Sequence, residues 1–125
     1  MAITGLDHVQ VAILPGGEAA ARTFYGGVLG LSEVPKPPAL AGRGGVWFAC
    51  GAQQLHCGLE DPVAPSRRHP ALLTDDLDAV RARLEAAGFP VRFDVELPGY
   101  RRFYTEDPFG NRLELLQRIG MPEAS

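Results

Sequence analysis

Four residues with metal-binding side chains recur at matching intervals along this chain. His8 and His56 are 48 residues apart, and His69 and Glu114 are 45 residues apart, so each half of the sequence carries one such pair. Together they include every histidine of the 125 residues. Imidazole and carboxylate are donors for Zn, Fe, Ni or Mn in proteins. The types and spacing of these residues therefore predict a pseudo-symmetric divalent-metal site.

The elements that must position these residues follow one order twice, namely a strand, a helix and three strands. Strand-like alternation and helical periodicity identify the first set: a strand at 3–13, a helix at 18–29, and strands at 32–35, 45–50 and 54–60. The same patterns identify the second set: a strand at 69–74, a helix starting near 77 whose apolar face includes Ala87, and strands at 91–96, 101–106 and 111–117.

A polar, proline-bearing connection over 60–66 lies between the two sets. We therefore expect one α+β domain made of two βαβββ modules, residues 1–62 and 63–125. Between the last two strands, the segment 107–111 has the proline and glycine positions of a tight turn, which predicts a hairpin.

Strand alternation places most of the candidate ligands on one kind of face. His8, His56 and Glu114 each alternate with apolar neighbours that would pack against a helix, so their side chains should lie on the opposite face. His69 precedes a proline and has no clear alternation. A single such residue is more commonly a solvated or hydrogen-bonded side chain. Agreement among the positions favours a shared metal site.

Composition limits the partners. The net charge of −3 is mild and the basic residues are scattered, which argues against nucleic acid and acidic membrane surfaces as partners. No apolar run is long enough for a membrane span, and the first residues do not resemble an export signal. Two cysteines are too few for a disulfide framework. We expect a cytoplasmic protein with free thiols.

Two motifs in this plan resemble a known family. The pair Phe24-Tyr25 stands ahead of Gly30-Leu31, and the segment 107–114 reads D-P-F-G-N-R-L-E. Together with the repeated βαβββ order, they resemble the vicinal oxygen chelate superfamily. That group includes glyoxalase I, fosfomycin-resistance proteins, extradiol dioxygenases and bleomycin-resistance proteins. The resemblance covers essentially the whole chain, and the second motif is its most specific part.

The resemblance implies a fold and a site. In the family each module curls into a half-barrel, two modules enclose a cleft, and metal ligands lie on the first and last strands of each module. The matching positions here are His8, His56, His69 and Glu114. The resemblance leaves open whether His56 binds metal or contacts substrate. It also implies a homodimer, because short members usually build their sites between chains.

The resulting functional hypothesis is a glyoxalase-like lyase or isomerase that acts on a small oxygenated metabolite able to chelate a divalent metal. Glu114 is the candidate catalytic base as well as a ligand. Tyr104 and Arg102 share a face of the strand before the hairpin and are candidate substrate contacts, and Trp47 is a candidate wall of the pocket. For Arg102 and Tyr104 a solvated or edge position is an equal alternative, and for Trp47 core packing is the stronger one.

Two alternatives remain open. The first is a metal-free protein that binds and sequesters a small molecule, as bleomycin-resistance proteins do. The second is an Fe(II) extradiol-type dioxygenase with a two-histidine, one-carboxylate centre. Ala12 stands where glyoxalase I has a glutathione-binding arginine, and after Glu114 only Arg118 could assist a phosphonate site. The sequence therefore favours neither a glutathione adduct nor a phosphonate as substrate.

Overall fold

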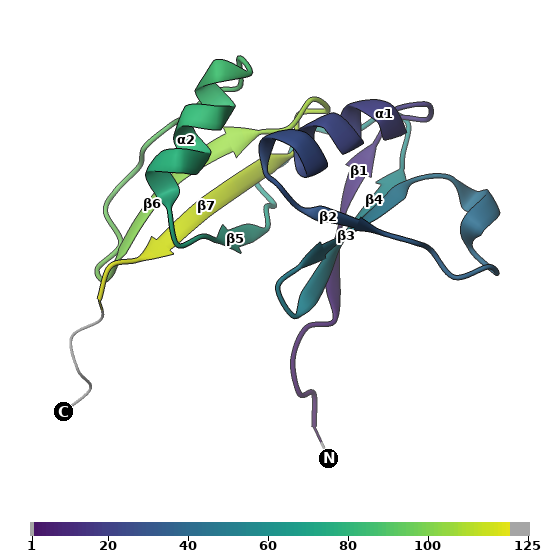
Figure 1. Cartoon of the computed structure of the whole chain (residues 1–125), viewed down its shortest axis with the longest axis horizontal. Helices are drawn as coiled ribbons and strands as arrows, with labels where there is room; N and C mark the ends of the chain where they lie inside the picture. Colours follow the sequence, from purple (N-terminus) through teal and green to yellow (C-terminus); the bar gives the residue numbers. More distant parts are fainter. Residues whose placement is uncertain (1, 121–125) are drawn as a thin grey trace. The chain divides into compact units, whose positions relative to one another are not determined.

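The computed structural model describes residues 2–120, which fall into two compact units that divide between Ala64 and Pro65. The division lies inside the proline-bearing connection, just after the expected boundary at 62. Each unit combines a small sheet with helical segments, so the predicted α+β class is confirmed (Figure 1). Within residues 2–120, no helix has both the length and the apolar character that a membrane span requires.

The first unit is built on a four-stranded sheet with the order β1-β4-β3-β2. β1 runs parallel to β4, and the other neighbours are antiparallel. The elements, in chain order, are β1 His8–Ile13, α1 Glu18–Ala21, the π-helical segment η1 Arg22–Val28, β2 Ser32–Val34, the 3₁₀ turn η2 Ala41–Arg43, β3 Val46–Cys50 and β4 Gln53–Leu59.

One face of this sheet forms the core with the helical segment. Phe24 and Tyr25 of η1 are fully buried, as are Ile13, Phe48 and Leu55 of the strands. The Tyr25 and Phe48 rings lie 5.8 Å apart. Because strand side chains alternate between faces, this packing directs the residues between the buried ones to the opposite side of the sheet.

Two expectations for the first unit were wrong in their bounds. The first strand begins at His8 and not at residue 3, because its pairing with β4 begins at His8 and Gln54, one residue after β4 starts. The helix expected over 18–29 is α-helical for one turn and then π-helical. Leu29 N–H donates to Phe24 O, five residues back, at 2.9 Å. The wider turn accommodates two consecutive glycines where a regular α-helix is weakest.

Hydrogen bonds fix the C-terminal end of the proline- and glycine-rich loop that precedes β3. The Lys36 ammonium donates to the carbonyls of Gly44 and Gly45, and Gly45 N–H donates to Glu18 Oε2 at 3.1 Å. Gly45 has φ +83°, and a Cβ there would overlap the Cys57 carbonyl oxygen. Only glycine fits this close approach of loop and strand.

The second unit has a three-stranded sheet with the order β5-β7-β6. β5 is parallel to β7, and β6 is antiparallel to it. The elements are β5 Ala71–Leu73, α2 Leu77–Ala86, β6 Tyr100–Glu106 and β7 Arg112–Arg118. At the hairpin between the last two strands, Asp107 Oδ1 accepts bonds from the backbone of Phe109 and Asn111, both at 2.9 Å.

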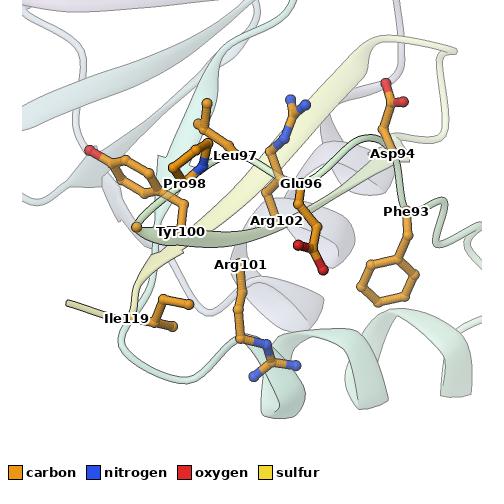
Figure 2. Close-up of a pocket in the computed structure, with 10 residues that line it drawn as sticks. Phe93, Asp94, Glu96, Leu97, Pro98, Tyr100, Arg101, Arg102 and Ile119 are labelled. Carbon is orange, nitrogen blue, oxygen red and sulfur yellow. The ribbon is translucent and has the colours of Figure 1, made fainter. Parts of the chain in front are cut away.

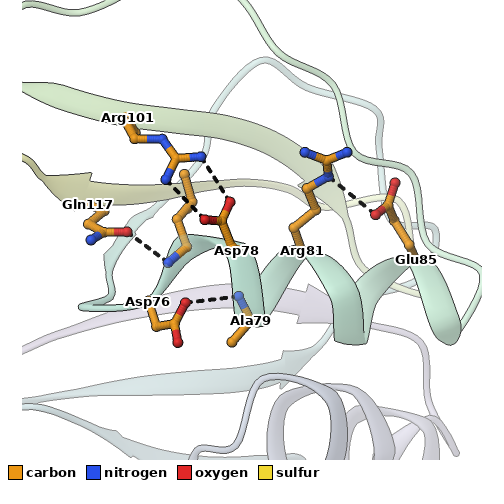
Figure 3. A network of polar contacts seen from close by, with 8 residues as sticks. Asp76, Asp78, Ala79, Arg81, Glu85, Arg101 and Gln117 are labelled. Atoms are coloured by element: carbon orange, nitrogen blue, oxygen red, sulfur yellow. Dashed lines mark hydrogen bonds and ion pairs between the residues drawn. The ribbon is translucent and has the colours of Figure 1, made fainter.

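Helix α2 is fixed at its start and along its inner face. The Asp76 carboxylate caps it by accepting from Ala79 N–H at 3.1 Å, and Gln117 Oε1 of β7 accepts from Leu77 N–H at 2.8 Å. On its outer part, Arg101 of β6 pairs with Asp78 (Figure 3). The side chains that α2 buries against the sheet are Leu77, Val80 and Leu84.

Three expectations for the second unit were also wrong. No strand forms over 91–96; only Arg92 bridges to Tyr104. Beyond that bridge, side chains provide the hydrogen-bond partners of the Val95 backbone. The Val95 N–H donates to the Asp94 carboxylate, and the Val95 carbonyl accepts from the Arg102 guanidinium. The chain therefore leaves the sheet edge. Ala87 is exposed because α2 ends one residue earlier. The strand expected at 69–74 is shorter and comprises only Ala71–Leu73, so His69 lies before β5 and not on it.

Candidate functional site

In the first unit the candidate ligands lie in a stack of rings. Trp47 of β3 and Gln10 of β1 are the register partners of His56 on β4. The Trp47 and His56 rings stack at 3.8 Å between centroids with 2° between planes, and His8 stacks on His56 at 4.1 Å. His56 is therefore held between two rings on the face opposite the core.

The surroundings of His56 favour its neutral form. The residue is 5% exposed, and burial, followed by the neighbouring His8, lowers the pKa of His56. Gln54 Oε1 lies 2.8 Å from His56 Nε2, and Asp7 Oδ2 lies 2.9 Å from His8 Nδ1. A neutral imidazole is the form that binds metals.

In the second unit, His69 and Glu114 meet directly. His69 Nε2 lies 3.1 Å from Glu114 Oε1, and His69 Nδ1 lies 2.9 Å from the Arg67 carbonyl. Glu114 N–H donates to Pro70 O at 3.0 Å. This backbone bond ties β7 to the residue that follows His69, just before β5. Glu114 itself is buried. The backbone thus fixes both members of the pair.

Arg102 occupies the other side of the Glu114 carboxylate. Its Nη1 lies 3.5 Å from Glu114 Oε2 and donates to Tyr104 OH at 2.9 Å, while Nη2 donates to Val95 O at 2.8 Å. Burial alone would lower the pKa of Arg102, but Tyr104 and Glu114 raise it. Arg102 therefore stays charged and joins β6, β7 and the segment that leaves the sheet edge.

Tyr104 lies among cations and rings on the same face. Its ring makes an edge contact with His69 at 5.2 Å between centroids. The guanidinium carbon of Arg112 lies 4.6 Å from the Tyr104 centroid, closer than that of Arg102 at 5.5 Å. These distances allow cation–π attraction, so this face is cationic around one buried carboxylate.

A pocket of about 570 Å³ adjoins this cluster. Figure 2 shows the side chains of Arg101 and Arg102, which both line the pocket, pointing in opposite directions, and Leu97, Pro98 and Tyr100 grouped at one side. Arg102 lines the pocket and also contacts Glu114. Arg102 is therefore the residue that the pocket shares with the cluster around Glu114.

A family model described as the Glyoxalase/Bleomycin resistance protein/Dioxygenase superfamily matches residues 5–115. The chain belongs to this superfamily. The vicinal oxygen chelate family suggested by the D-P-F-G-N-R-L-E segment is thereby confirmed. No curated protein matches the chain.

Solved structures of superfamily members are similar to it along nearly their full length. A protein from Bacillus anthracis assigned to the glyoxalase family is 44% identical, with a TM-score of 0.87 over 94% of this chain and 98% of that one. The antibiotic-binding protein TnmS3 from a Streptomyces species is 26% identical, with a TM-score of 0.73 and coverages of 94% and 98%. Lactoylglutathione lyase from Agrobacterium tumefaciens is 26% identical, with a TM-score of 0.69 and coverages of 92% and 94%.

Superfamily members commonly use divalent metals, and the donor pair of the second unit fits one. Two ligands bound at about 2.1 Å to one ion lie about 3.0–3.4 Å apart, which matches the separation of His69 Nε2 and Glu114 Oε1. A metal-binding histidine typically directs its other nitrogen to a carbonyl or carboxylate, as His69 does toward Arg67. Across residues 2–120, however, no three metal-binding groups are gathered in one place.

The structure thus brings His8 together with His56, and His69 together with Glu114. Of the predicted substrate contacts, Arg102 and Tyr104 lie beside Glu114, and Trp47 stacks on His56. The roles of all seven residues remain predictions.

Sequence reasoning missed one neighbour of these residues, Arg112. Strand alternation could have identified it, because it lies two positions before Glu114 on the same strand.

Proposed function

We propose that this superfamily member is a divalent-metal-dependent lyase or isomerase acting on a small metabolite with neighbouring oxygens. The observation that carries the proposal is the His69–Glu114 pair. A buried carboxylate faces an imidazole nitrogen at 3.1 Å, and the backbone orients that imidazole from its other side. This combination of donors and outer contacts is typical of a metal-binding site.

In this proposal His69 and Glu114 bind the metal together with His8, and His56 acts either as a fourth ligand or as a substrate contact. The lowered pKa of His56 favours the neutral imidazole, which suits both roles. A bound divalent ion supplies Lewis acidity toward a substrate that chelates it through two oxygens. Two histidines and one carboxylate would leave coordination positions for such a substrate.

The chain's own groups would perform the proton transfer and the orientation. Glu114 accepts a proton from the carbon beside a substrate carbonyl, and its buried position keeps it clear of bulk water. The Arg102 guanidinium and the Tyr104 hydroxyl donate to substrate oxygens on the same face. Trp47 forms an apolar wall beside His56.

A second candidate is a metal-free protein that sequesters a small molecule. The stack of Trp47, His56 and His8 favours it, because stacked rings offer a flat surface to an aromatic ligand and Gln54 engages one nitrogen of His56. The similar structure TnmS3 is an antibiotic-binding protein.

We further propose that the protein is a cytoplasmic homodimer. The short family members to which the chain is similar motivate the dimer, and the two free cysteines are compatible with a reducing compartment. Sedimentation equilibrium tests the assembly: a mass of one chain at micromolar concentration would contradict it.

Calorimetric titration with Zn²⁺, Ni²⁺, Mn²⁺ and Fe²⁺ separates the two functions. An enzyme of the proposed kind should bind one ion per site, and Glu114→Gln should abolish that binding and any turnover. Glu106→Gln is the matched control, since Glu106 is on the paired strand but contacts Arg92. A sequestering protein would show no metal binding in any of the three proteins and would keep its affinity for an aromatic ligand in Glu114→Gln.

A further inference from the structure

We propose that Arg112 is an oxyanion-recognition residue, so that the substrate of this site carries a carboxylate or phosphonate group. The inference rests on the proposed function, because it concerns the face that carries Glu114. Arg112 and Glu114 are separated by one residue of β7, so their side chains leave the same face about 7 Å apart along the strand. A ligand at Glu114 would be within reach of the Arg112 side chain.

The first argument is that Arg112 lacks a counter-charge. Its register partner on β6, Glu106, pairs with Arg92, and Glu114 is engaged by Arg102 and His69. Among residues 2–120, no carboxylate forms an ion pair with Arg112, although its side chain is partly buried. A partly buried cation without a partner attracts an anion from solution.

The second argument is geometric. Arg112 lies over the Tyr104 ring with 4.6 Å between its guanidinium carbon and the ring centroid. Contact with the ring restrains the guanidinium and leaves its N–H donors available at the edge. Arginine in such a fixed orientation binds a carboxylate or phosphonate through two parallel hydrogen bonds.

The third argument is the balance of charge on this face. Two ion pairs neutralise the other charges of this cluster, Arg92 with Glu106 and Arg102 with Glu114. The charge of Arg112 is left uncompensated. Within residues 2–120, Arg118 is a second cation without an ion pair on the same strand and face, but it is exposed at the strand end. Arg118 therefore provides a control with the same charge change at a residue that does not lie over the Tyr104 ring.

The test measures binding of three probes to metal-free protein by NMR titration. Mandelate carries a carboxylate, mandelamide is its uncharged counterpart, and phenylphosphonate carries the other oxyanion. The wild type should bind at least one anion about tenfold more tightly than mandelamide. Arg112→Gln should lose that preference, Arg112→Lys should keep part of it, and Arg118→Gln should keep all of it.

Equal affinity of the wild type for all three probes would overturn the inference, and so would an equal loss in Arg112→Gln and Arg118→Gln. If mandelate alone is preferred, the group is a carboxylate; if phenylphosphonate alone is preferred, it is a phosphonate. Because the titration needs no metal, failure of the metal proposal would not alter its result. An unchanged urea midpoint in Arg112→Gln shows that the lost binding does not reflect unfolding.

Discussion

Replacing Arg102 with alanine is expected to destabilise the second unit much more than replacing its neighbour Arg101. The two arginines are adjacent on β6 and point to opposite faces of the sheet (Figure 2). Arg102 contacts Glu114, Tyr104 and the Val95 carbonyl, whereas Arg101 pairs with Asp78 on α2. The comparison therefore separates a buried polar cluster from an exposed ion pair.

The magnitude follows from distance and burial. At 3.5 Å and an effective dielectric constant of about 20, the attraction between Arg102 and Glu114 is about 5 kcal/mol. Desolvation offsets much of it, but the alanine variant leaves a carboxylate that is 9% exposed without its cation. We expect a loss of about 2–4 kcal/mol in the free energy of unfolding. The side chains of Arg101 and Asp78 are 42% and 68% exposed, so Arg101→Ala should lower the free energy of unfolding much less than Arg102→Ala.

Urea titration followed by circular dichroism measures both losses, with the slope compared to confirm that the unfolded states are alike. A loss in Arg102→Ala no larger than that in Arg101→Ala would refute the reasoning. It would mean that the Glu114 carboxylate is adequately solvated or compensated without Arg102.

Three further changes test the surrounding fold. Asp76→Ala removes the cap of α2 and should lower the free energy of unfolding by about 1 kcal/mol in urea titration, with no effect expected from Asp75→Ala. Gly45→Ala should lower the free energy of unfolding by roughly 2–5 kcal/mol, because the φ of Gly45 is positive and an added Cβ would overlap a backbone oxygen. Gly51→Ala should lower it less, because a Cβ at Gly51 meets open space, and thermal unfolding compares the two variants. Hydrogen bonding from the Gly45 amide lowers the pKa of Glu18. The contribution of the Glu18 carboxylate to folding stability is therefore present above about pH 4.3 and is lost as the pH falls through the lowered pKa. Glu18→Gln should therefore lose less stability than the wild type as the pH is lowered through this range, and parallel curves of stability against pH would contradict this.

Alternation in the strands was sufficient to predict which faces carry the candidate residues. His56 lies between buried Leu55 and Cys57, and Glu114 lies between buried Leu113 and Leu115. All six are buried, yet the polar ones face away from the helix, as the period of two requires. The α+β class followed from the repeated order of elements.

The sequence did not predict features that depend on side-chain hydrogen bonds to the backbone or on the register of strand pairing. Residues 91–96 have strand-like composition, but Arg102 and Asp94 take the hydrogen bonds of Val95. The stacking of Trp47 on His56 depends on the register of β3 and β4, which a single sequence does not specify. The contact between His69 and Glu114 likewise required the parallel pairing of β5 with β7.

The metal content of tag-free protein tests the central claim most directly. Elemental analysis of the wild type should find about one Zn, Fe, Ni or Mn per site, and His69→Ala should lose it because the imidazole that faces Glu114 is gone. Absence of metal from both proteins, even after incubation with each ion, would contradict the metal-dependent function and leave small-molecule sequestration as the better explanation.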